Sequence, residues 1–299
     1  MKILNADYER PYSSVTLKYG NERKILLRIG GLKTKEIKKL AAAFFDSDFT
    51  LKESGFEKFE KFLGMALQLD SQFRCYADAL DYIITEREKQ SRKKRIREKF
   101  PNGIQSKDLN RIIKATLYPY QKEAVLKAIE AGRFILADDM GLGKTLLSLA
   151  IAELFKTISG IESVLIICPT SLKYQWESEI KKFTNSASKV IEGLANQREE
   201  QYASNEFYKI ISYHVAARDT ELINKMKPDL IILDEAQRIK NWKTKTAQSI
   251  KQLDSPYCLV LTGTPLENNP DGLHSLVEFV DWYKTGLLAR FLFDHQITD

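Results

Sequence analysis

LIILDEAQ, at residues 230–237, is the stretch that decides the fold of this chain. Its four consecutive apolar residues predict a strand buried on both faces, because a strand with one solvated face alternates apolar and polar side chains. Two adjacent carboxylates, Asp234 and Glu235, follow the strand directly. Open α/β sheets bind their ligands at the carboxyl ends of parallel strands. The stretch therefore predicts a covered parallel sheet with a polar site at its edge.

Four further apolar runs have the same continuous character, and amphipathic segments lie between them. The five runs cover residues 134–137, 164–167, 209–212, 230–233 and 258–261. Residues 145–156 and 173–183 are expected to form crossover helices, the second with Trp176, Ile180 and Phe183 on one face. This alternation of strands and helices indicates a doubly wound α/β domain built on a parallel sheet.

The first hundred residues differ in character from the rest. Segments 14–19 and 24–28 predict a β-hairpin, with Gly20 and Asn21 in its turn. An apolar stripe at helical spacing predicts a core-facing helix, and its members are Phe56, Phe59, Leu63, Ala66 and Leu67. We expect a small α+β or mostly helical accessory domain at residues 1–110, followed by the doubly wound domain at residues 111–299.

A longer helix is expected from about residue 72 into a basic stretch at residues 86–99. This stretch holds eight lysines and arginines against three glutamates, a net charge of +5, whereas the whole chain carries only +6. Such a run could follow the phosphate backbone of a nucleic acid. A solvated helix end or linker is the alternative, because charge runs are common without nucleic acid.

Composition excludes several classes of protein. The chain has 299 residues, of which 43% are hydrophobic and 29% charged, as in ordinary globular proteins. It contains no run of 18 apolar residues and does not begin like a secretory signal, so neither a membrane span nor secretion is expected. Cys75, Cys168 and Cys258 are far apart, which argues against a disulfide framework or a zinc site. We expect an intracellular protein, nucleoid-associated in the cytoplasm of a prokaryote or nuclear in a eukaryote.

A glycine-rich segment, DDMGLGKT at residues 138–145, follows the first apolar run and opens a helix, which is the setting of a phosphate-binding loop. The residues expected to bind ATP there are Met140, Gly141, Leu142, Gly143, Lys144 and Thr145. The two glycines let the backbone curl so that N–H groups point at phosphate oxygens, and the helix dipole adds positive potential. Lys144 would lie between the β- and γ-phosphates, and Thr145 would offer its hydroxyl to Mg²⁺. Asp138 departs from the usual pattern, which has glycine at this position.

The carboxylate pair supplies two roles, because adjacent side chains at a strand end diverge. Asp234 can hold Mg²⁺, and Glu235 can polarise the water that attacks the γ-phosphate. Two carboxylates beside a triphosphate would repel it without a metal, so the pair itself implies Mg²⁺. Lys144, Asp234 and Glu235 are therefore the candidate catalytic residues.

A hydroxyl-bearing turn, Thr262-Gly263-Thr264-Pro265, follows the last apolar run. Turns of this composition are common, so the segment alone is weak evidence. Its hydroxyls could sense whether the carboxylate pair faces the γ-phosphate. Thr262 and Thr264, together with Gln237, are the residues expected to couple nucleotide state to movement.

In combination these motifs resemble the first RecA-like lobe of the Swi/Snf-type (sucrose-nonfermenting) ATPases of helicase superfamily two. The family has an acidic residue where Asp138 stands. Further similar segments are Leu117–Gln121, Ile167–Leu172 with Trp176-Glu177, Ile211–Tyr213, Asp234–Asn241 and Leu261–Asn269. The segment Asp234–Asn241 is the strongest match, because its Lys-Asn ending separates the family from DEAD-box helicases. The resemblance covers about residues 113–295.

The resemblance implies a RecA-like fold of the P-loop NTPase type and ATP-driven translocation along double-stranded DNA, with remodelling of DNA-bound proteins. It assigns adenine recognition to Gln121. The residues that it places near the DNA backbone are Thr170, Ser171, Ser212, Tyr213 and Lys240. Phosphate contacts suit a translocase, because they carry no sequence information. The family's engine also needs a second RecA-like lobe, which supplies an arginine finger.

Nothing in the sequence after residue 269 resembles a second RecA-like lobe, so we expect the chain alone to bind Mg·ATP weakly and to be nearly inactive as an ATP hydrolase. Two other functions stay open. One is a strand-separating DNA or RNA helicase, which Arg238–Asn241 and Trp176-Glu177 disfavour. The other is a natural single-lobe module that binds nucleotide or DNA without turnover of its own.

Overall fold

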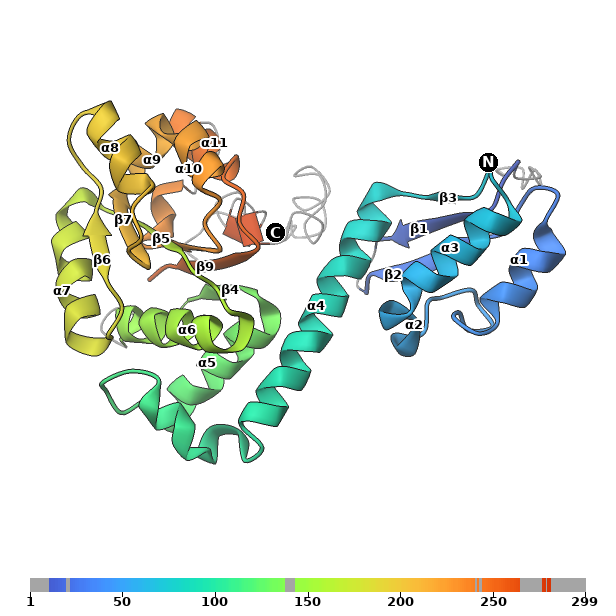
Figure 1. Ribbon diagram of the computed structural model, residues 1–299, viewed down its shortest axis with the longest axis horizontal. Helices are drawn as coiled ribbons and strands as arrows, with labels where there is room; N and C mark the ends of the chain where they lie inside the picture. The colour runs from blue at the N-terminus through green and yellow to red at the C-terminus, as the bar shows by residue number, and fades with distance from the viewer. Residues whose placement is uncertain are drawn as a thin grey trace, which may run out of the picture. The chain divides into compact units, whose positions relative to one another are not determined.

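The computed structural model describes residues 11–19, 22–137, 143–239, 241, 244–263, 276–277 and 279–280 (Figure 1). Contacts within the chain form two compact units, Met1–Ser91 and Arg92–Asp299. The division falls within one long helix, α4 (Ala77–Lys99), which occupies the basic stretch as expected. The boundary near residue 110 that the sequence indicates for the functional domains stays a prediction. Among the described residues, no helix is both long and apolar enough to cross a membrane.

The first unit is a three-stranded sheet with helices packed on one face. Strand β1 (Ser14–Lys18) pairs antiparallel with β2 (Lys24–Arg28), which confirms the predicted hairpin, and parallel with β3 (Arg74–Cys75). The helices before α4 are α1 (Thr34–Ala41), α2 (Glu53–Glu57) and α3 (Phe59–Leu69). Val15, Leu17, Ile25 and Leu27 alternate inward along the hairpin and join the helices in one apolar cluster. This is an α+β unit, one of the two possibilities that the sequence left open.

The predicted apolar stripe of the first unit is partly wrong. A break at Lys58 separates α2 from α3, and the buried face of α3 carries Phe59, Phe62 and Ala66. Leu67, which was expected in the core, is 46% exposed. Phe62 lies at the centre instead, with its ring 4.9 to 5.9 Å from four other phenylalanine rings. Within α3, Phe62 and Leu67 lie on opposite sides of the line through Phe59 and Ala66, so helical spacing alone does not say which of the two faces the core.

The second unit contains a six-stranded, all-parallel sheet in the order β4-β9-β8-β5-β7-β6. Its strands are β4 (Arg133–Leu136), β5 (Val164–Cys168), β6 (Ser188–Val190), β7 (Tyr208–Ser212), β8 (Leu230–Leu233) and β9 (Tyr257–Leu261). All five apolar runs of the sequence form strands. Strand β6 is a short edge strand that the sequence did not reveal, because three residues with one buried side chain make no detectable pattern. The arrangement is the predicted doubly wound, RecA-like sheet.

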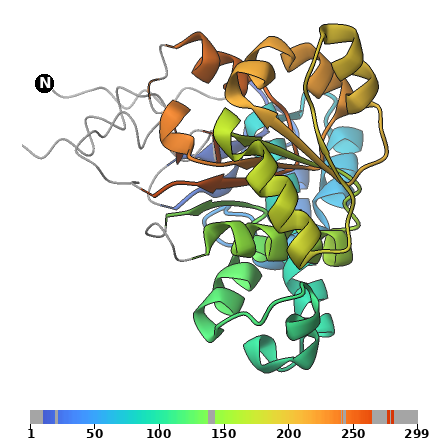
Figure 2. The ribbon, with the colours of Figure 1, turned by 90° about the vertical axis from the view of Figure 1, so that its left-hand side faces the viewer.

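Helices cover both faces of this sheet, which explains the continuous hydrophobicity of its strands. The helices are α5 (Pro119–Ala131), α6 (Lys144–Ser159), α7 (Lys173–Phe183), α8 (Ala195–Tyr202), α9 (Tyr213–Arg218), α10 (Thr220–Met226) and α11 (Lys245–Lys251), with 3₁₀ turns η1 (Gly103–Gln105), η2 (Lys107–Arg111), η3 (Thr170–Leu172) and η4 (Ala236–Ile239). Figures 1 and 2 show α5 and α6 on one side of the sheet and α8 to α11 on the other. Ile166 and Ile232 point to the first side, and Ile167 and Ile231 to the second.

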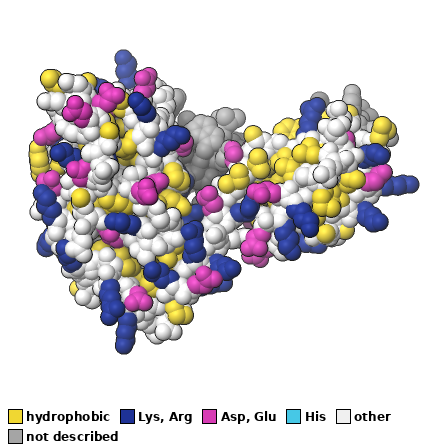
Figure 3. Space-filling model, viewed as in Figure 1, with side chains coloured by type: hydrophobic (Ala, Val, Ile, Leu, Met, Phe, Trp, Pro, Cys, Tyr) yellow, Lys and Arg dark blue, Asp and Glu magenta, His cyan; other side chains and the backbone are white. Residues whose placement is uncertain are grey.

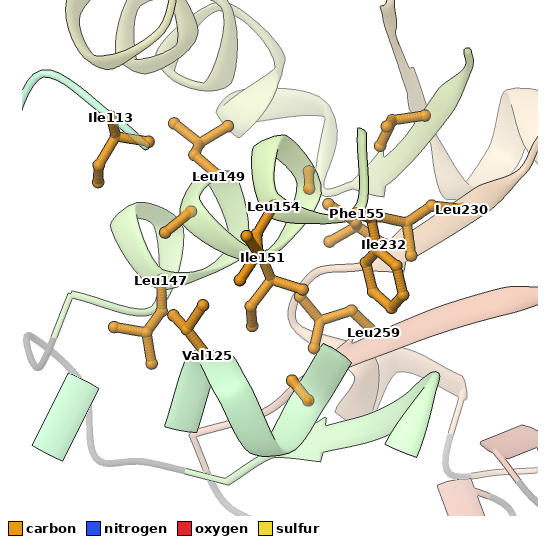
Figure 4. Packing of buried hydrophobic residues seen from close by; sticks show 14 of the residues in the cluster. Ile113, Val125, Leu147, Leu149, Ile151, Leu154, Phe155, Leu230, Ile232 and Leu259 are labelled. Carbon is orange, nitrogen blue, oxygen red and sulfur yellow. The ribbon is translucent and has the colours of Figure 1, made fainter. Parts of the chain in front are cut away.

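The helix that follows the phosphate-loop segment is held firmly in this core. Leu147, Ile151, Leu154 and Phe155 of α6 are at most 1% exposed. They pack between α5 and the sheet. The sheet contributes Leu230, Ile232 and Leu259 to this cluster (Figure 4). The amino end of α6 is therefore fixed in position at the edge of the sheet.

Part of the basic stretch stabilises the fold, because two of its arginines bind the carboxyl ends of neighbouring helices. Arg92 is 3% exposed, and its guanidinium donates to the carbonyls of Ile129, Glu130 and Ala131 in the last turn of α5, at 3.1 to 3.4 Å. Arg95 donates likewise to the carbonyl of Ile158 near the end of α6, at 2.8 Å. Cations at helix carboxyl ends satisfy orphan carbonyls and favourably oppose the helix dipole. On the face of the molecule drawn in Figure 3, basic and acidic side chains are interspersed.

Replacing Arg92 with methionine is expected to lower the free energy of unfolding by about 1.5–3 kcal/mol, the usual contribution of hydrogen bonds from a charged donor. Methionine keeps much of the apolar stem but removes the donor to three carbonyls of the last turn of α5, which lie in buried or partly buried positions. Urea unfolding of the chain measures the loss. Lys94→Met, at an exposed position of the same helix, is the control and should change stability little. Equal losses in the two variants would contradict the role given to Arg92.

Candidate nucleotide-binding site

Lys144 and Thr145 form the first turn of α6, at the carboxyl edge of the sheet. Gly143 precedes them with φ of +81°, a left-handed conformation that favours glycine. The amino end of a sixteen-residue helix has backbone N–H groups that the helix itself does not pair and a positive dipole, which together suit a phosphate. Met140, Gly141 and Leu142, also expected to bind ATP, lie outside the described residues.

Asp234 and Glu235 follow β8, which lies between β5 and β9. The backbone N–H of Asp234 donates to the carbonyl of Ile167 at 2.8 Å and so continues the pairing with β5. Asp234 is 8% exposed. Its Oδ2 accepts a hydrogen bond from Nε1 of Trp176 at 2.8 Å, and its Oδ1 accepts one from the backbone N–H of Glu235 at 2.9 Å.

One cleft of about 520 Å³ brings the two motifs together. Its lining residues are Gly143, Lys144, Thr145 and Leu146 of the α6 end, Asp234 and Glu235 of the β8 end, and Leu172, Gln175, Trp176, Glu179 and Phe183 of the α7 region. All candidate catalytic residues therefore face one space, together with the hydroxyl-bearing Thr145. Segments 90 residues apart in the sequence meet there because parallel strands end at the same edge of the sheet.

Burial raises the pKa of the Asp234 carboxyl above its ordinary value, and the neighbouring Glu235 adds to the rise. The hydrogen bond from Trp176 and the positive charge of Lys144 act in the opposite direction. Asp234 is thus a carboxylate whose charge depends on specific partners in the cleft.

The donor set fits Mg²⁺. Each oxygen of Asp234 accepts one hydrogen bond and retains a lone pair, and Thr145, which carries a hydroxyl, lines the same cleft. Among the described residues, no group of three or more histidine, cysteine, aspartate or glutamate side chains gathers as a metal cage. Mg²⁺ needs no such cage, because it keeps several waters and binds through one or two carboxylates plus substrate phosphates.

Gln237 connects Glu235 to the end of β9. Glu235 has φ of +51°, a left-handed conformation that is uncommon for a residue with a side chain. Its carboxylate accepts a hydrogen bond from Nε2 of Gln237, whose Oε1 accepts one from the Thr262 hydroxyl at 3.3 Å. The structure therefore places two of the three expected coupling residues in one chain of hydrogen bonds. Thr264, the third, lies outside the described residues.

Gln121 is 4% exposed in the first turn of α5. Its Oε1 accepts a hydrogen bond from the backbone N–H of Tyr118 at 3.0 Å. A Cβ at Gly143 would lie 3.3 Å from its Nε2, so the glutamine is packed against the end of the phosphate-loop segment. Tyr118 and Tyr120 stack beside it, 65% and 51% exposed, with ring centroids 6.0 Å apart. The sequence analysis gives these tyrosines no role, although two aromatic residues next to a candidate adenine-binding glutamine are visible in the sequence.

The residues expected near DNA fall into two groups. Thr170 and Ser171 are exposed in η3, as a backbone contact requires. Ser212 and Tyr213 are each 4% exposed: the Ser212 hydroxyl caps α9 by accepting from the N–H of Val215, and the Tyr213 hydroxyl donates to the carbonyl of Asp234 at 2.7 Å. Their side chains are engaged inside the protein, and a contact of these two residues with DNA stays a prediction. Lys240 lies outside the described residues.

Comparison with known proteins identifies a family for most of the chain. Residues 71–298 match the SNF2-related domain. The chain is 37% identical over 172 residues to an uncharacterised ATP-dependent helicase of Mycoplasma genitalium, and 34% identical over 193 residues to the DNA repair and recombination protein RAD54B of Gallus gallus. These matches cover 55% and 58% of this chain but only 17% and 21% of the relatives, so the chain spans about a fifth of their length.

A solved structure gives the same result for the fold. The Sulfolobus solfataricus SWI2/SNF2 ATPase core in complex with double-stranded DNA aligns with a TM-score of 0.56 and 34% sequence identity. The alignment covers 60% of this chain and 39% of that one. The family match, residues 71–298, includes every residue that lines the cleft.

Proposed function

The chain belongs to the SNF2-related family, and from this premise we propose that it is the ATP-binding lobe of a DNA-dependent ATPase that translocates on double-stranded DNA and remodels protein–DNA complexes. The observation that carries the proposal is the meeting of Lys144, Thr145, Asp234 and Glu235 in one cleft. A helix amino end with a lysine binds phosphate, and a carboxylate pair opposite it supports hydrolysis.

In this proposal the triphosphate of ATP lies at the amino end of α6. Lys144 neutralises charge on the β- and γ-phosphates, and Glu235 accepts the proton of the attacking water. Gln121 holds the adenine, and the exposed rings of Tyr118 and Tyr120 are further candidates for contact with the base. Mg²⁺, when bound, would neutralise charge on the phosphate oxygens, and Thr145 and Asp234 are the residues that would hold it.

The hydrogen-bonded series Glu235, Gln237 and Thr262 supports a coupling role for these residues. Rotation of the Glu235 side chain toward the γ-phosphate would break its bond to Gln237 and release Thr262 at the end of β9. In this proposal the DNA backbone lies against Thr170 and Ser171, with Lys240 as a third contact. A second RecA-like lobe would supply an arginine finger, which contributes about 10³–10⁵ in rate in other enzymes, so this lobe alone should turn over ATP very slowly.

The direct test is Lys144→Ala. Loss of a charge-assisted bond to phosphate costs about 1.5–3 kcal/mol, so affinity for a fluorescent ATP analogue with Mg²⁺ should fall by about 10- to 150-fold. Fluorescence anisotropy on the chain measures it. Lys156→Ala, near the other end of α6, removes the same charge far from the cleft and should bind as the parent chain does. Unchanged binding in Lys144→Ala would refute the proposed site.

A further inference from the structure

The indole of Trp176 makes an unusual contact for a core residue. Trp176 is 2% exposed and lies in the first turn of α7, where its ring joins the apolar cluster between α7 and the sheet. The Nε1–H is the only polar group of a tryptophan side chain and needs an acceptor when buried. Here the acceptor is Oδ2 of Asp234 at 2.8 Å, a carboxylate that lines the cleft.

We propose that Trp176 is a positioning residue that fixes the orientation of the Asp234 carboxylate for Mg²⁺ in the nucleotide site. The inference rests on the proposed function, because it presupposes that Mg·ATP binds in this cleft. It adds a residue on α7 to a metal site otherwise formed by the ends of α6 and β8.

Geometry explains why such a residue is needed. The torsion that rotates an aspartate carboxylate is broad and only two-fold, so the side chain does not fix its own orientation. Two hydrogen bonds fix it here, one to each oxygen: the N–H of Glu235 holds Oδ1, and the indole of Trp176 holds Oδ2. The bond to Glu235 is local and follows from the turn after β8. The bond to Trp176 comes from 58 residues away, so it is the one that places the carboxylate relative to α7.

Each oxygen of Asp234 keeps one lone pair for a metal or for a water bound to it. Partners that hydrogen-bond to metal-binding carboxylates contribute about 10- to 100-fold to metal affinity, because they set the direction of the lone pairs. Purely apolar packing by the indole ring would contribute to stability but not to this direction. Removal of the indole N–H alone should therefore lower the affinity for Mg²⁺ if Trp176 orients the carboxylate, but not if its ring only packs in the core.

The experiment compares Trp176→Phe with Tyr213→Phe in the full chain. Trp176→Phe keeps an apolar ring and removes the donor to the carboxylate. Tyr213→Phe is the matched control, because it removes an equally buried donor that bonds to the Asp234 main-chain carbonyl instead. Binding of a fluorescent ATP analogue is followed by anisotropy, first with EDTA and then across a series of Mg²⁺ concentrations.

Trp176→Phe should raise the Mg²⁺ concentration for half-maximal nucleotide binding by about 10- to 100-fold, without changing nucleotide binding in EDTA. Tyr213→Phe should leave the Mg²⁺ requirement as in the parent chain. If Trp176→Phe needs the same Mg²⁺ concentration as the parent chain, the proposal is overturned. It is also overturned if the substitution weakens nucleotide binding equally with and without Mg²⁺, because that result is expected of a purely structural residue. Absence of Mg²⁺-dependent nucleotide binding by the parent chain would overturn the proposed function as well.

A second measurement covers the case in which Trp176→Phe does not fold. The indole N–H of Trp176 gives its own signal in a ¹⁵N–¹H spectrum of the parent chain, assigned with Trp242→Phe and Trp282→Phe variants. Addition of Mg²⁺ to the chain saturated with nucleotide should shift this signal, because the acceptor carboxylate then faces a divalent cation. An unmoved Trp176 signal under conditions in which Mg²⁺ tightens nucleotide binding would overturn the proposal.

Discussion

Glu235→Gln is expected to lower the rate of ATP hydrolysis by about 10²- to 10⁴-fold while leaving ATP binding nearly unchanged, because general-base catalysis contributes rate enhancement of that size. Glutamine has the shape of glutamate, and its carbonyl oxygen can still accept the hydrogen bond from Gln237. The substitution therefore removes the base without removing the side chain from its place beside Asp234. Lys144 and Thr145, which would bind the phosphates, are untouched.

The rate is measured in single-turnover experiments with a second RecA-like lobe and duplex DNA supplied, and binding is measured separately with a fluorescent ATP analogue. Glu179→Gln is the matched control, since Glu179 lines the same cleft from α7 and has no proposed catalytic role. It should leave the rate close to that of the parent chain. A comparable loss of rate in both variants would show that the charge of the cleft matters rather than the base at Glu235.

Much of the second unit could be predicted because its strands are buried on both faces. A run such as residues 230–233 has no solvated side, so hydrophobicity alone marks it as a central strand. The edge strand β6 has Ser188 and Lys189 next to Val190 and gives no such signal. In the first unit the helical stripe could not be assigned correctly, because Phe62 and Leu67 flank the same stripe and spacing alone does not decide which of them faces the core.

The candidate site could be predicted only as far as local motifs reach. Lys144, Thr145, Asp234 and Glu235 meet in the cleft because each follows or opens an element whose place in a parallel sheet is fixed by topology. The hydrogen bond between Trp176 and Asp234 depends on how α7 packs against the sheet, and no local sequence pattern predicts that packing. The same limit applies to Ser212 and Tyr213: a polar residue after a strand can face solvent or the interior, and here both face inward.

Arg198→Met is expected to destabilise the second unit by about 3–5 kcal/mol, the cost of leaving one member of a buried ion pair without its partner. Arg198 of α8 donates through Nε and Nη2 to the two oxygens of Asp219, both at 2.6 Å, and through Nη1 to the carbonyl of Gly193 at 2.8 Å. The two charged side chains are only 9% and 4% exposed. After the substitution, Asp219 would retain the Tyr202 hydroxyl at 3.1 Å but no positive charge.

Urea unfolding of three variants tests this assignment. Lys181→Met breaks the exposed pair of Lys181 with Glu177 and should cost less than about 1 kcal/mol, because water already screens that pair. Arg198→Met combined with Asp219→Leu should be more stable than Arg198→Met alone, since it no longer buries an uncompensated carboxylate. Recovery in the double variant would locate the cost in the stranded charge of Asp219. If Arg198→Met costs no more than Lys181→Met, the ion pair does not hold α8 to the segment that joins α9 and α10.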